Sequence, residues 1–275
     1  MGMLEGKVAL VTGSARGIGR ATAELLAEQG ASVVINDLDQ DVAEEAAAAI
    51  VGQTAVFSAD LTKGDAPERL VQTAIDSFGR IDVIVNNAGY TLDAPIHKME
   101  DDAFQAMLDI HVIAPYRILK AAAPHIREPA KQEREEGVEH FRKIVNVSSI
   151  SGTMGNAGQA NYSSAKSAIL GLTKTLAKEW GQFKVNVNAV AFGFIDTRMT
   201  VAKTSDSVVQ FGDRTVQVGI PEQQRAMVEA MIPLGRAGTA REAAGGVVFL
   251  CSPWADYVSG QVLNITGGLP SGMVS

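Results

Sequence analysis

A tyrosine and a lysine near the middle of the chain have the spacing of an acid–base pair. Tyr162 and Lys166 lie in the run Ala-Asn-Tyr-Ser-Ser-Ala-Lys, and Ser149 precedes the tyrosine by thirteen residues. In a helix, positions i and i+4 share one face, so the ammonium group of Lys166 would lie beside the phenol. Because a nearby cation stabilises the ionised phenol, we expect the pKa of Tyr162 to fall below its ordinary value of about 10. Proton exchange with a substrate would then be more efficient.

The spacing alone does not identify a reactive pair, because Tyr116 and Lys120 have the same separation. Tyr116 lies in the run Ile-Ala-Pro-Tyr-Arg-Ile-Leu, which is typical of an apolar helix face. We expect this second pair to have a packing role, with the lysine in solvent. The elements that surround each pair must decide between them.

The composition favours one soluble domain and excludes several classes of protein. The chain has 275 residues, 46% of them hydrophobic, and a formal net charge of −7, so we expect neither a nucleic-acid partner nor an anionic membrane. The one cysteine, Cys251, has no disulfide partner, and the four histidines lack metal-ligand spacing. We expect no metal. No apolar run is long enough to span a bilayer and no secretion signal is recognisable, so we expect a cytoplasmic protein.

Short β-branched runs alternate with amphipathic helical patterns along the chain. Continuous apolar strands separated by helices indicate a parallel sheet that is covered on both faces. Right-handed crossovers then favour a single-domain, doubly wound α/β Rossmann fold with a mainly seven-stranded parallel sheet. The predicted strands are Val8–Thr12, Ser32–Ile35, Ala55–Ser58, Asp82–Val85, Lys143–Val147, Lys184–Val190 and Val262–Ile265, and the predicted helical stretches include Arg20–Gln29, Asp41–Val51, Ala66–Phe78 and Phe104–Ala123.

Two segments interrupt this alternation without dividing the single domain, 1–275. Residues 127–143 are dense in charges of both signs, which predicts a solvated insertion in the form of an exposed loop or short helix. Residues 197–223 are polar and contain glycine, and they follow the sixth predicted strand. Ligands bind at that edge of such a sheet, so a mobile lid over the substrate is expected there.

The first predicted strand runs directly into a glycine-rich turn, Thr-Gly-Ser-Ala-Arg-Gly-Ile-Gly, with a helix behind it. Glycines let the backbone bend tightly and approach a ligand closely. A helix N-terminus offers free N–H groups and partial positive charge to a pyrophosphate. The turn therefore predicts a dinucleotide site, and its residues are Gly13, Ser14, Arg16, Gly17, Ile18 and Gly19.

The ends of the next strands supply further candidate cofactor ligands. Asp37 ends the second strand, where a carboxylate can accept hydrogen bonds from the adenosine ribose and repel a 2′-phosphate. This favours NAD(H) over NADP(H), although Arg16 favours a phosphate. Asp60 and the adjacent Leu61 follow the third strand, near the expected adenine position. Small residues and amides follow the fourth strand and suit a surface against the cofactor, namely Asn87, Ala88 and Gly89.

With the glycine turn, Asn86-Asn-Ala-Gly89, Ser149 and Tyr162-x-x-x-Lys166 in this order, the chain resembles the short-chain dehydrogenase/reductase family over nearly its whole length. Within it, the run Gly155–Tyr162 is similar to 3-oxoacyl-thioester reductases and 3-hydroxyacyl-CoA dehydrogenases. The resemblance implies that Tyr162 exchanges a proton with the substrate oxygen. Lys166 would lower the phenol pKa and bind the nicotinamide ribose.

The same resemblance implies roles for four other positions. Ser149 would donate a hydrogen bond to the substrate oxygen, while Ile195 and Thr197 would meet the cofactor's carboxamide or phosphates. His111 occupies the place where the family usually has an asparagine that holds a water-mediated proton relay. Imidazole can hold a water and carry a proton, so His111 is either a relay member or a packed helix histidine. Phe192 replaces a usual proline and puts the local geometry and the substrate shape in question.

The resemblance implies an NAD(H)-dependent oxidoreductase that acts on a secondary alcohol or ketone. A 3-oxoacyl thioester on CoA or an acyl carrier protein is one substrate class, and a steroid, terpenoid or other secondary alcohol is the alternative. A non-catalytic NAD-binding scaffold is a remote alternative, because both Tyr162 and Lys166 are intact. Related enzymes are usually tetramers, which implies a homotetramer.

Overall fold

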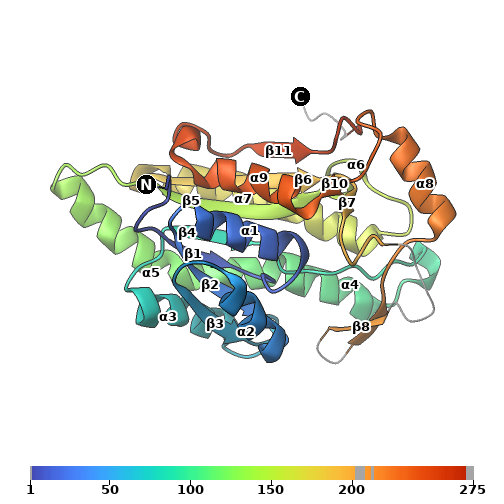
Figure 1. Cartoon of the computed structure of the whole chain (residues 1–275), viewed down its shortest axis with the longest axis horizontal. Coiled ribbons are helices and arrows are strands. Elements are labelled where there is room, and N and C mark those ends of the chain that lie inside the picture. Colours follow the sequence, from blue (N-terminus) through green and yellow to red (C-terminus); the bar gives the residue numbers. More distant parts are fainter. Residues whose placement is uncertain (1, 202–207, 212–213, 271–275) are drawn as a thin grey trace.

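The computed structural model (Figure 1) describes residues 2–201, 208–211 and 214–270. Seven parallel strands form one central sheet in the order β11-β6-β5-β4-β1-β2-β3. All seven predicted strands are present, with ends shifted by at most a few residues, so the predicted seven-stranded parallel sheet is confirmed. The strands are β1 (Val8–Val11), β2 (Ser32–Asp37), β3 (Thr54–Ser58), β4 (Val83–Asn86), β5 (Arg142–Ser149), β6 (Val185–Phe192) and β11 (Val262–Ile265).

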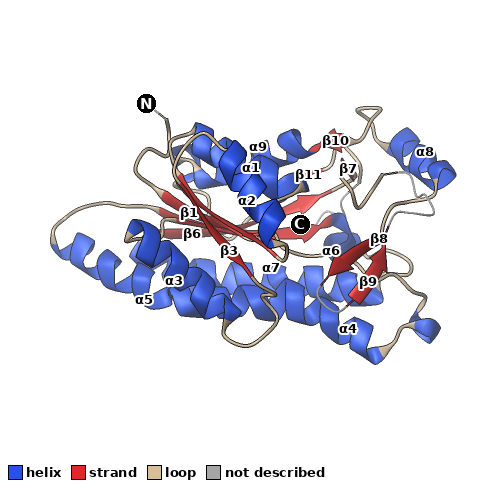
Figure 2. Ribbon diagram, turned by 60° about the horizontal axis from the view of Figure 1, so that its bottom comes forward, coloured by secondary structure: helices blue, strands red, loops and turns tan. Residues whose placement is uncertain are grey.

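Helices cover both faces of this sheet and make a three-layered α/β domain (Figure 2). One face carries α1 (Gly17–Glu28), α2 (Gln40–Ala49) and α9 (Ala240–Cys251). The opposite face carries α3 (Ala66–Phe78), α5 (Ala114–Glu135) and α7 (Ala160–Trp180). The described helices do not include one long and apolar enough to cross a membrane.

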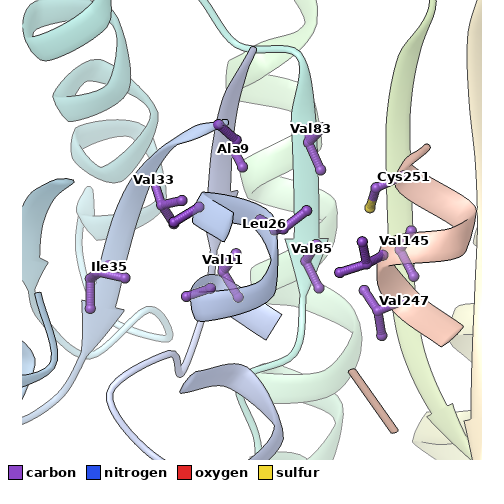
Figure 3. Close-up of a cluster of buried hydrophobic side chains, with 14 of the residues drawn as sticks. Ala9, Val11, Leu26, Val33, Ile35, Val83, Val85, Val145, Val247 and Cys251 are labelled. Atoms are coloured by element: carbon purple, nitrogen blue, oxygen red, sulfur yellow. The ribbon is translucent and has the colours of Figure 1, made fainter. Parts of the chain in front are cut away.

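Alternating side chains of the strands divide the core into two layers. In β1, Ala9 and Val11 pack toward α1 and α9, while Val8 and Leu10 pack toward α3 and α5. Leu26 of α1 lies over the centre of the first layer (Figure 3) and is fully buried. Because both faces are covered, nearly every position of β1, β4, β5 and β6 is buried, and their short apolar runs are the pattern that predicts a parallel sheet.

A nearly continuous helical run spans residues 101–135. It consists of α4 (Asp101–Leu108), a π-helical turn (Asp109–Ile113) and α5. The predicted charged insertion at 127–143 is therefore shared between the end of α5, a short loop and the start of β5. Its charges are not all in solvent, because Arg142 is buried and binds Glu133 through two hydrogen bonds of 2.8 Å.

Smaller elements gather at the carboxyl end of the sheet (Figure 2). The predicted lid, 197–223, contains the antiparallel hairpin of β8 and β9, and its residues 202–207 and 212–213 lie outside the described residues. The elements at this end are α6 (Ile150–Met154), β7 (Ile195–Asp196), β8 (Val208–Phe211), β9 (Arg214–Gln217), α8 (Glu222–Met231), β10 (Gly238–Thr239) and the short turn η1 (Ile96–Lys98). Two further short turns, η3 (Gly181–Phe183) and η4 (Pro253–Ala255), come before β6 and β11 in the chain.

Candidate active site

The strand order reverses between β1 and β4, and a large cavity opens at this point. From β1 the chain moves outward to β2 and β3, and it then returns to form β4 and β5 on the other side. The carboxyl ends of neighbouring strands diverge at such a reversal and leave a crevice for a ligand. Here the crevice is a cavity of about 1180 Å³, and most of the predicted site residues line it.

The glycine turn between β1 and α1 forms one side of the cavity. Gly13 has a φ of 61°, and a Cβ there would lie 2.8 Å from the Cα of Ala88. A Cβ at Gly19 would lie 2.1 Å from the carbonyl oxygen of Gly13, so both positions require glycine. The N-cap residue of α1, Arg16, makes no side-chain hydrogen bond to the first turn. The first-turn N–H groups of α1 are therefore available to an anion.

Two side chains tie the turn to the end of β4. The Thr12 hydroxyl accepts hydrogen bonds from the backbone N–H groups of Asn87 and Ala88, both at 2.9 Å. The Asn87 amide donates in return to the carbonyl oxygens of Thr12 and Gly13, at 2.9 and 3.1 Å. Sequence reasoning placed Asn87 beside the cofactor and missed Thr12, whose partners lie more than seventy residues away along the chain.

Ser14 and Asp60 have internal partners. Ser14 is fully buried, donates to the carbonyl oxygen of Val11 at 2.7 Å, accepts from the N–H of Asn36 at 3.0 Å, and does not line the cavity. Asp60 lines the cavity and accepts hydrogen bonds from the N–H and hydroxyl of Thr62, at 2.9 and 2.7 Å. Its neighbour Leu61 is buried in the same part of the cavity lining.

Asp37 lies at the end of β2, where it lines the cavity beside the guanidinium group of Arg16. Its carboxylate is 3.5 Å from Nη1 of Arg16 and accepts a hydrogen bond from the N–H of Ala15 at 3.3 Å. Arg16 also binds Asp39, at 3.0 Å. Burial and the charge of Arg16 lower the pKa of Arg198, while Asp37 raises it. The positive charges of Arg16 and Arg198 therefore both act on the part of the cavity that Asp37 lines.

The opposite side of the cavity holds Ser149, Tyr162 and Lys166. Ser149 ends β5, and the other two lie in the first two turns of α7. Lys166 is buried, donates to the carbonyl oxygen of Val147 at 2.7 Å, and has its Nζ 5.6 Å from the centre of the Tyr162 ring. Burial lowers the pKa of Lys166 to about 7.

The Tyr162 phenol is held in its neutral form. Burial raises the pKa of the phenol and the charge of Asp93 raises it further, while a hydrogen bond with Ser149 lowers it. The resulting pKa is about 12. The prediction that Lys166 lowers the pKa of Tyr162 is therefore wrong for this structure. Desolvation of the phenolate outweighs the cation, since the lysine is itself buried and bound to a backbone carbonyl.

Asn161 fixes the start of α7 and was missed by sequence reasoning. Its side-chain oxygen accepts from the N–H of Tyr162 at 2.7 Å, and its amide donates to the carbonyl oxygens of Leu92 at 2.9 Å and Ala103 at 3.3 Å. The amide thus joins α7 to the loop after β4 and to α4. An asparagine at a helix start is usually a cap, so nothing in the sequence marked this wider role.

His111 lies in the π-helical turn, buried beside Tyr162. The two rings meet edge to face with their centres 5.1 Å apart. Its Nε2 lies 2.8 Å from the carbonyl oxygen of Tyr90, and because a carbonyl only accepts, Nε2 carries the proton. The buried Nδ1 has no hydrogen-bond partner. Burial, together with the charge of Lys166, lowers the pKa of His111 well below its ordinary value, so the ring is neutral.

Gly89 makes room for this ring, because a Cβ there would lie 2.0 Å from Cε1 of His111. Ile195, Thr197 and Phe192 line the cavity beyond the end of β6. Strand β6 remains regular as far as Phe192, which pairs in register with Ser149. The backbone at Phe192 is therefore regular, and its ring, 6% exposed, is part of the core layer and also lines the cavity.

The competing pair is remote from this site. Tyr116 is 46% exposed on α5, and Lys120 lies over its ring at 6.0 Å. Neither residue lines the cavity, and they form a cation–π contact at the surface. A group of His, Cys, Asp or Glu residues that could hold a metal ion is absent from the part of the chain described.

The chain is similar to known reductases over nearly its whole length. A family model described as enoyl-(acyl carrier protein) reductase matches residues 13–270. The 3-oxoacyl-[acyl-carrier-protein] reductases FabG of Vibrio cholerae and Thermotoga maritima are each 37% identical to it, over 266 and 269 residues. That of Vibrio harveyi is 40% identical over 270 residues. Each alignment covers 97% of this chain and 98% of the relative.

Proposed function

Because the chain belongs to the short-chain dehydrogenase/reductase family, through the enoyl-(acyl carrier protein) reductase model that it matches, we propose that it reduces the keto group of a 3-oxoacyl thioester with NADH. The single observation that carries this proposal is the convergence of Ser149, Tyr162 and Lys166 on one cavity, opposite the glycine turn. The FabG relatives are named as reductases of 3-oxoacyl groups on an acyl carrier protein, which supports the thioester.

The residues of the cavity fit a nicotinamide dinucleotide. Gly17, at the start of α1, has a φ of 56°, a conformation that residues other than glycine rarely adopt, and a Cβ there would lie 4.0 Å from the Thr197 side chain. The free N–H groups of α1 are suited to the pyrophosphate. When bound, the dinucleotide supplies or accepts the hydride. Apolar and backbone surface for the dinucleotide comes from Ile18, Leu61, Ala88 and Ile195. Asn87 and Gly89 line the same cavity.

Proton transfer is the task of Tyr162. With a pKa of about 12 the phenol keeps its proton at neutral pH, so the proton is present for donation to an oxygen that gains negative charge during reduction. The Ser149 hydroxyl can donate a hydrogen bond to the same oxygen and stabilise that charge. Lys166, with a pKa of about 7, can return a proton to the phenol after transfer.

His111 is suited to continue this proton path. Its unpartnered Nδ1 is a hydrogen-bond acceptor beside Tyr162, and its electrostatic coupling to Lys166 indicates that the two are close. A water molecule that donates to Nδ1 could accept from the Lys166 ammonium, whose other partner is the carbonyl oxygen of Val147. The imidazole would then do what an amide oxygen does in relatives that have asparagine here.

We propose NAD(H) as the preferred cofactor because of Asp37. Its carboxylate lines the cavity at the end of β2 with its side chain 15% exposed, where it can accept hydrogen bonds from ribose hydroxyls. A 2′-phosphate would meet this negative charge at close range. Arg16 and Arg198 offset part of that repulsion, so the preference depends on one side chain.

We further propose that residues 197–223 cover the substrate and that the single domain assembles as a homotetramer. Met199 and Val218, at opposite ends of the segment, both line the cavity, and the N–H of Gly219 donates to the carbonyl oxygen of Met199 at 3.3 Å. Assembly is supported by exposed aromatic side chains beside β11, a strand with only one neighbour.

The test is reduction of acetoacetyl-CoA by NADH, alongside cyclic and steroid ketones. We expect the thioester to be reduced with the highest kcat/KM, and Tyr162→Phe to lower kcat by at least about a hundredfold without changing the Kd for NADH. Ser167→Ala, an exposed position on the same helix, is the matched control. A Tyr162→Phe enzyme as active as the wild type would contradict the assigned role of the phenol. A wild-type enzyme that binds NADH but reduces no ketone would be a scaffold instead.

A further inference from the structure

The loop after β4 carries a carboxylate into the substrate end of the cavity. Asp93 lines the cavity together with Ser149 and Tyr162. Gln159 donates a hydrogen bond from Nε2 to Oδ2 of Asp93 at 2.9 Å, and the Thr91 hydroxyl donates to Oδ1. Both carboxylate oxygens are therefore occupied, and the side chain is held in one position although it lies near the mouth.

Gln159 connects this carboxylate to the serine that would bind the substrate oxygen. The Oε1 atom of Gln159 accepts from the Ser151 hydroxyl at 2.9 Å and from the Asn156 amide at 3.0 Å. The N–H of Ser151 in turn donates to the hydroxyl oxygen of Ser149 at 3.2 Å. A chain of hydrogen bonds thus fixes Asp93 relative to Ser149, so its charge has a constant place beside the reacting group.

The charge of Asp93 reaches the reacting group. After burial, Asp93 is the charged group that raises the pKa of the Tyr162 phenol. The other charged side chains that line this end of the cavity are Lys98 and Glu100, both exposed, while Lys166 lies beneath the phenol and is bound to the carbonyl oxygen of Val147. The substrate end therefore carries more negative than positive charge at its mouth.

We propose that Asp93 is a specificity-determining residue that rejects substrates with a negative charge close to the reacting carbonyl. The inference rests on the proposed function and narrows its substrate class. In a free 3-oxo acid the carboxylate is two carbons from the keto group, so binding the keto oxygen at Ser149 and Tyr162 brings that charge near Asp93. A thioester or ester carries no charge there and meets no such repulsion.

The substitution Asp93→Asn removes the charge and keeps the shape. The amide oxygen can still accept from Gln159, and the amide nitrogen can donate to the Thr91 hydroxyl in the reverse direction. The experiment measures kcat/KM with NADH for acetoacetate and for ethyl acetoacetate, which share one reacting keto group and differ in charge. We expect the acid-to-ester ratio to rise about tenfold in Asp93→Asn, mainly through acetoacetate.

Glu100→Gln is the matched control, because Glu100 lines the same cavity but has no hydrogen bond to Gln159. The acid-to-ester kcat/KM ratio of Glu100→Gln should stay within about twofold of the wild-type value. Higher ionic strength should raise the ratio in the wild type and leave it unchanged in Asp93→Asn, since salt screens only the charged pair.

An unchanged acid-to-ester ratio in Asp93→Asn, or an equal rise of that ratio in Glu100→Gln, would overturn the inference. Reduction of ethyl acetoacetate by the same enzymes would still support the proposed function. A wild-type enzyme that reduces neither acetoacetate, ethyl acetoacetate nor acetoacetyl-CoA would overturn the proposed function and the inference with it.

Discussion

At the scale of single residues, burial decides the protonation of the site more than the sequence neighbours do. Tyr162 and Lys166 lie four residues apart on one helix face, as the spacing predicts, yet both pKa values move toward the neutral forms. Each group loses its hydration when it enters the cavity wall, and the charged form bears that cost. The result is a protonated phenol above a lysine that titrates near neutral pH.

Replacement of His111 separates a proton relay from a packing role. His111→Asn keeps a side-chain acceptor in the π-helical turn, while His111→Phe keeps a ring and removes both Nδ1 and the Nε2 donor to the Tyr90 carbonyl oxygen. We expect His111→Phe to lower kcat by about tenfold to a hundredfold and His111→Asn to stay within about threefold of wild type, with an unchanged Kd for NADH in both. Stopped-flow NADH absorbance and thermal unfolding provide the measurements. Equal rates in all three enzymes would leave only the packing role.

Asp37→Ala tests the cofactor preference at the residue that carries it. Once the carboxylate is gone, Arg16 and Arg198 remain beside the ribose position and favour a phosphate. We expect the kcat/KM ratio of NADPH to NADH to rise at least about tenfold. Asp39→Ala is the control, because Asp39 also binds Arg16 but is 46% exposed and does not line the cavity. A ratio that does not move in Asp37→Ala would remove Asp37 from the cofactor site.

At the scale of elements, β1 and β4 are held together at both ends by polar side chains. At the carboxyl ends, Thr12 and Asn87 bind each other's backbone. At the amino ends, the buried carboxylate of Asp82 accepts from the N–H of Val8 at 2.9 Å, from Arg80 at 2.7 Å and from His140 at 2.7 Å. These contacts keep the two strands in register where the cavity opens between them.

Asp82→Asn should weaken this junction in a pH-dependent way. Burial alone raises the pKa of Asp82, but the hydrogen bonds from His140, Arg80 and Val8 together lower it to about 2. The folded-state pKa is thus below the ordinary value, so the stabilisation is complete above about pH 4 and is lost as the pH falls toward 2. We expect a loss of about 2 kcal/mol in the free energy of unfolding at pH 7.

Urea unfolding at pH 7 and pH 3 measures this difference. The control is Asp76→Asn on α3, whose exposed carboxylate accepts only from Gln72, and it should change stability by less than about 0.5 kcal/mol. A loss in Asp82→Asn that is as large at low pH as at pH 7 would mean that the carboxylate's charge does not stabilise the strands.

At the scale of the whole molecule, one end of the sheet exposes unusual apolar surface. Trp254 is 73% exposed and Tyr257 is fully exposed, and both lie in the segment that connects α9 to the edge strand β11 in the chain. Exposed aromatic groups of this size are typical of an interface between subunits. The opposite edge strand, β3, does not have a comparable aromatic pair among the described residues nearby.

Trp254→Ser should therefore weaken association of the proposed homotetramer. We expect the wild type to show four times the chain mass of 29.0 kDa in light scattering after gel filtration, and the variant to shift toward smaller species at the same concentration. Val51→Ser is the control, because Val51 is 92% exposed and lies at the end of α2. A wild-type mass of one chain would refute the assembly.

The sequence by itself determined the sheet and the glycine turn, and it pointed to the side chains that we propose to react. Buried parallel strands must be continuous apolar runs, and a tight turn against a ligand must be glycine, so both leave local marks. Only the tertiary structure decided that Tyr162 is neutral, that His111 lies against its ring and that Asp93 is held by Gln159. These features depend on desolvation and on contacts between segments distant in the chain, which no local pattern encodes.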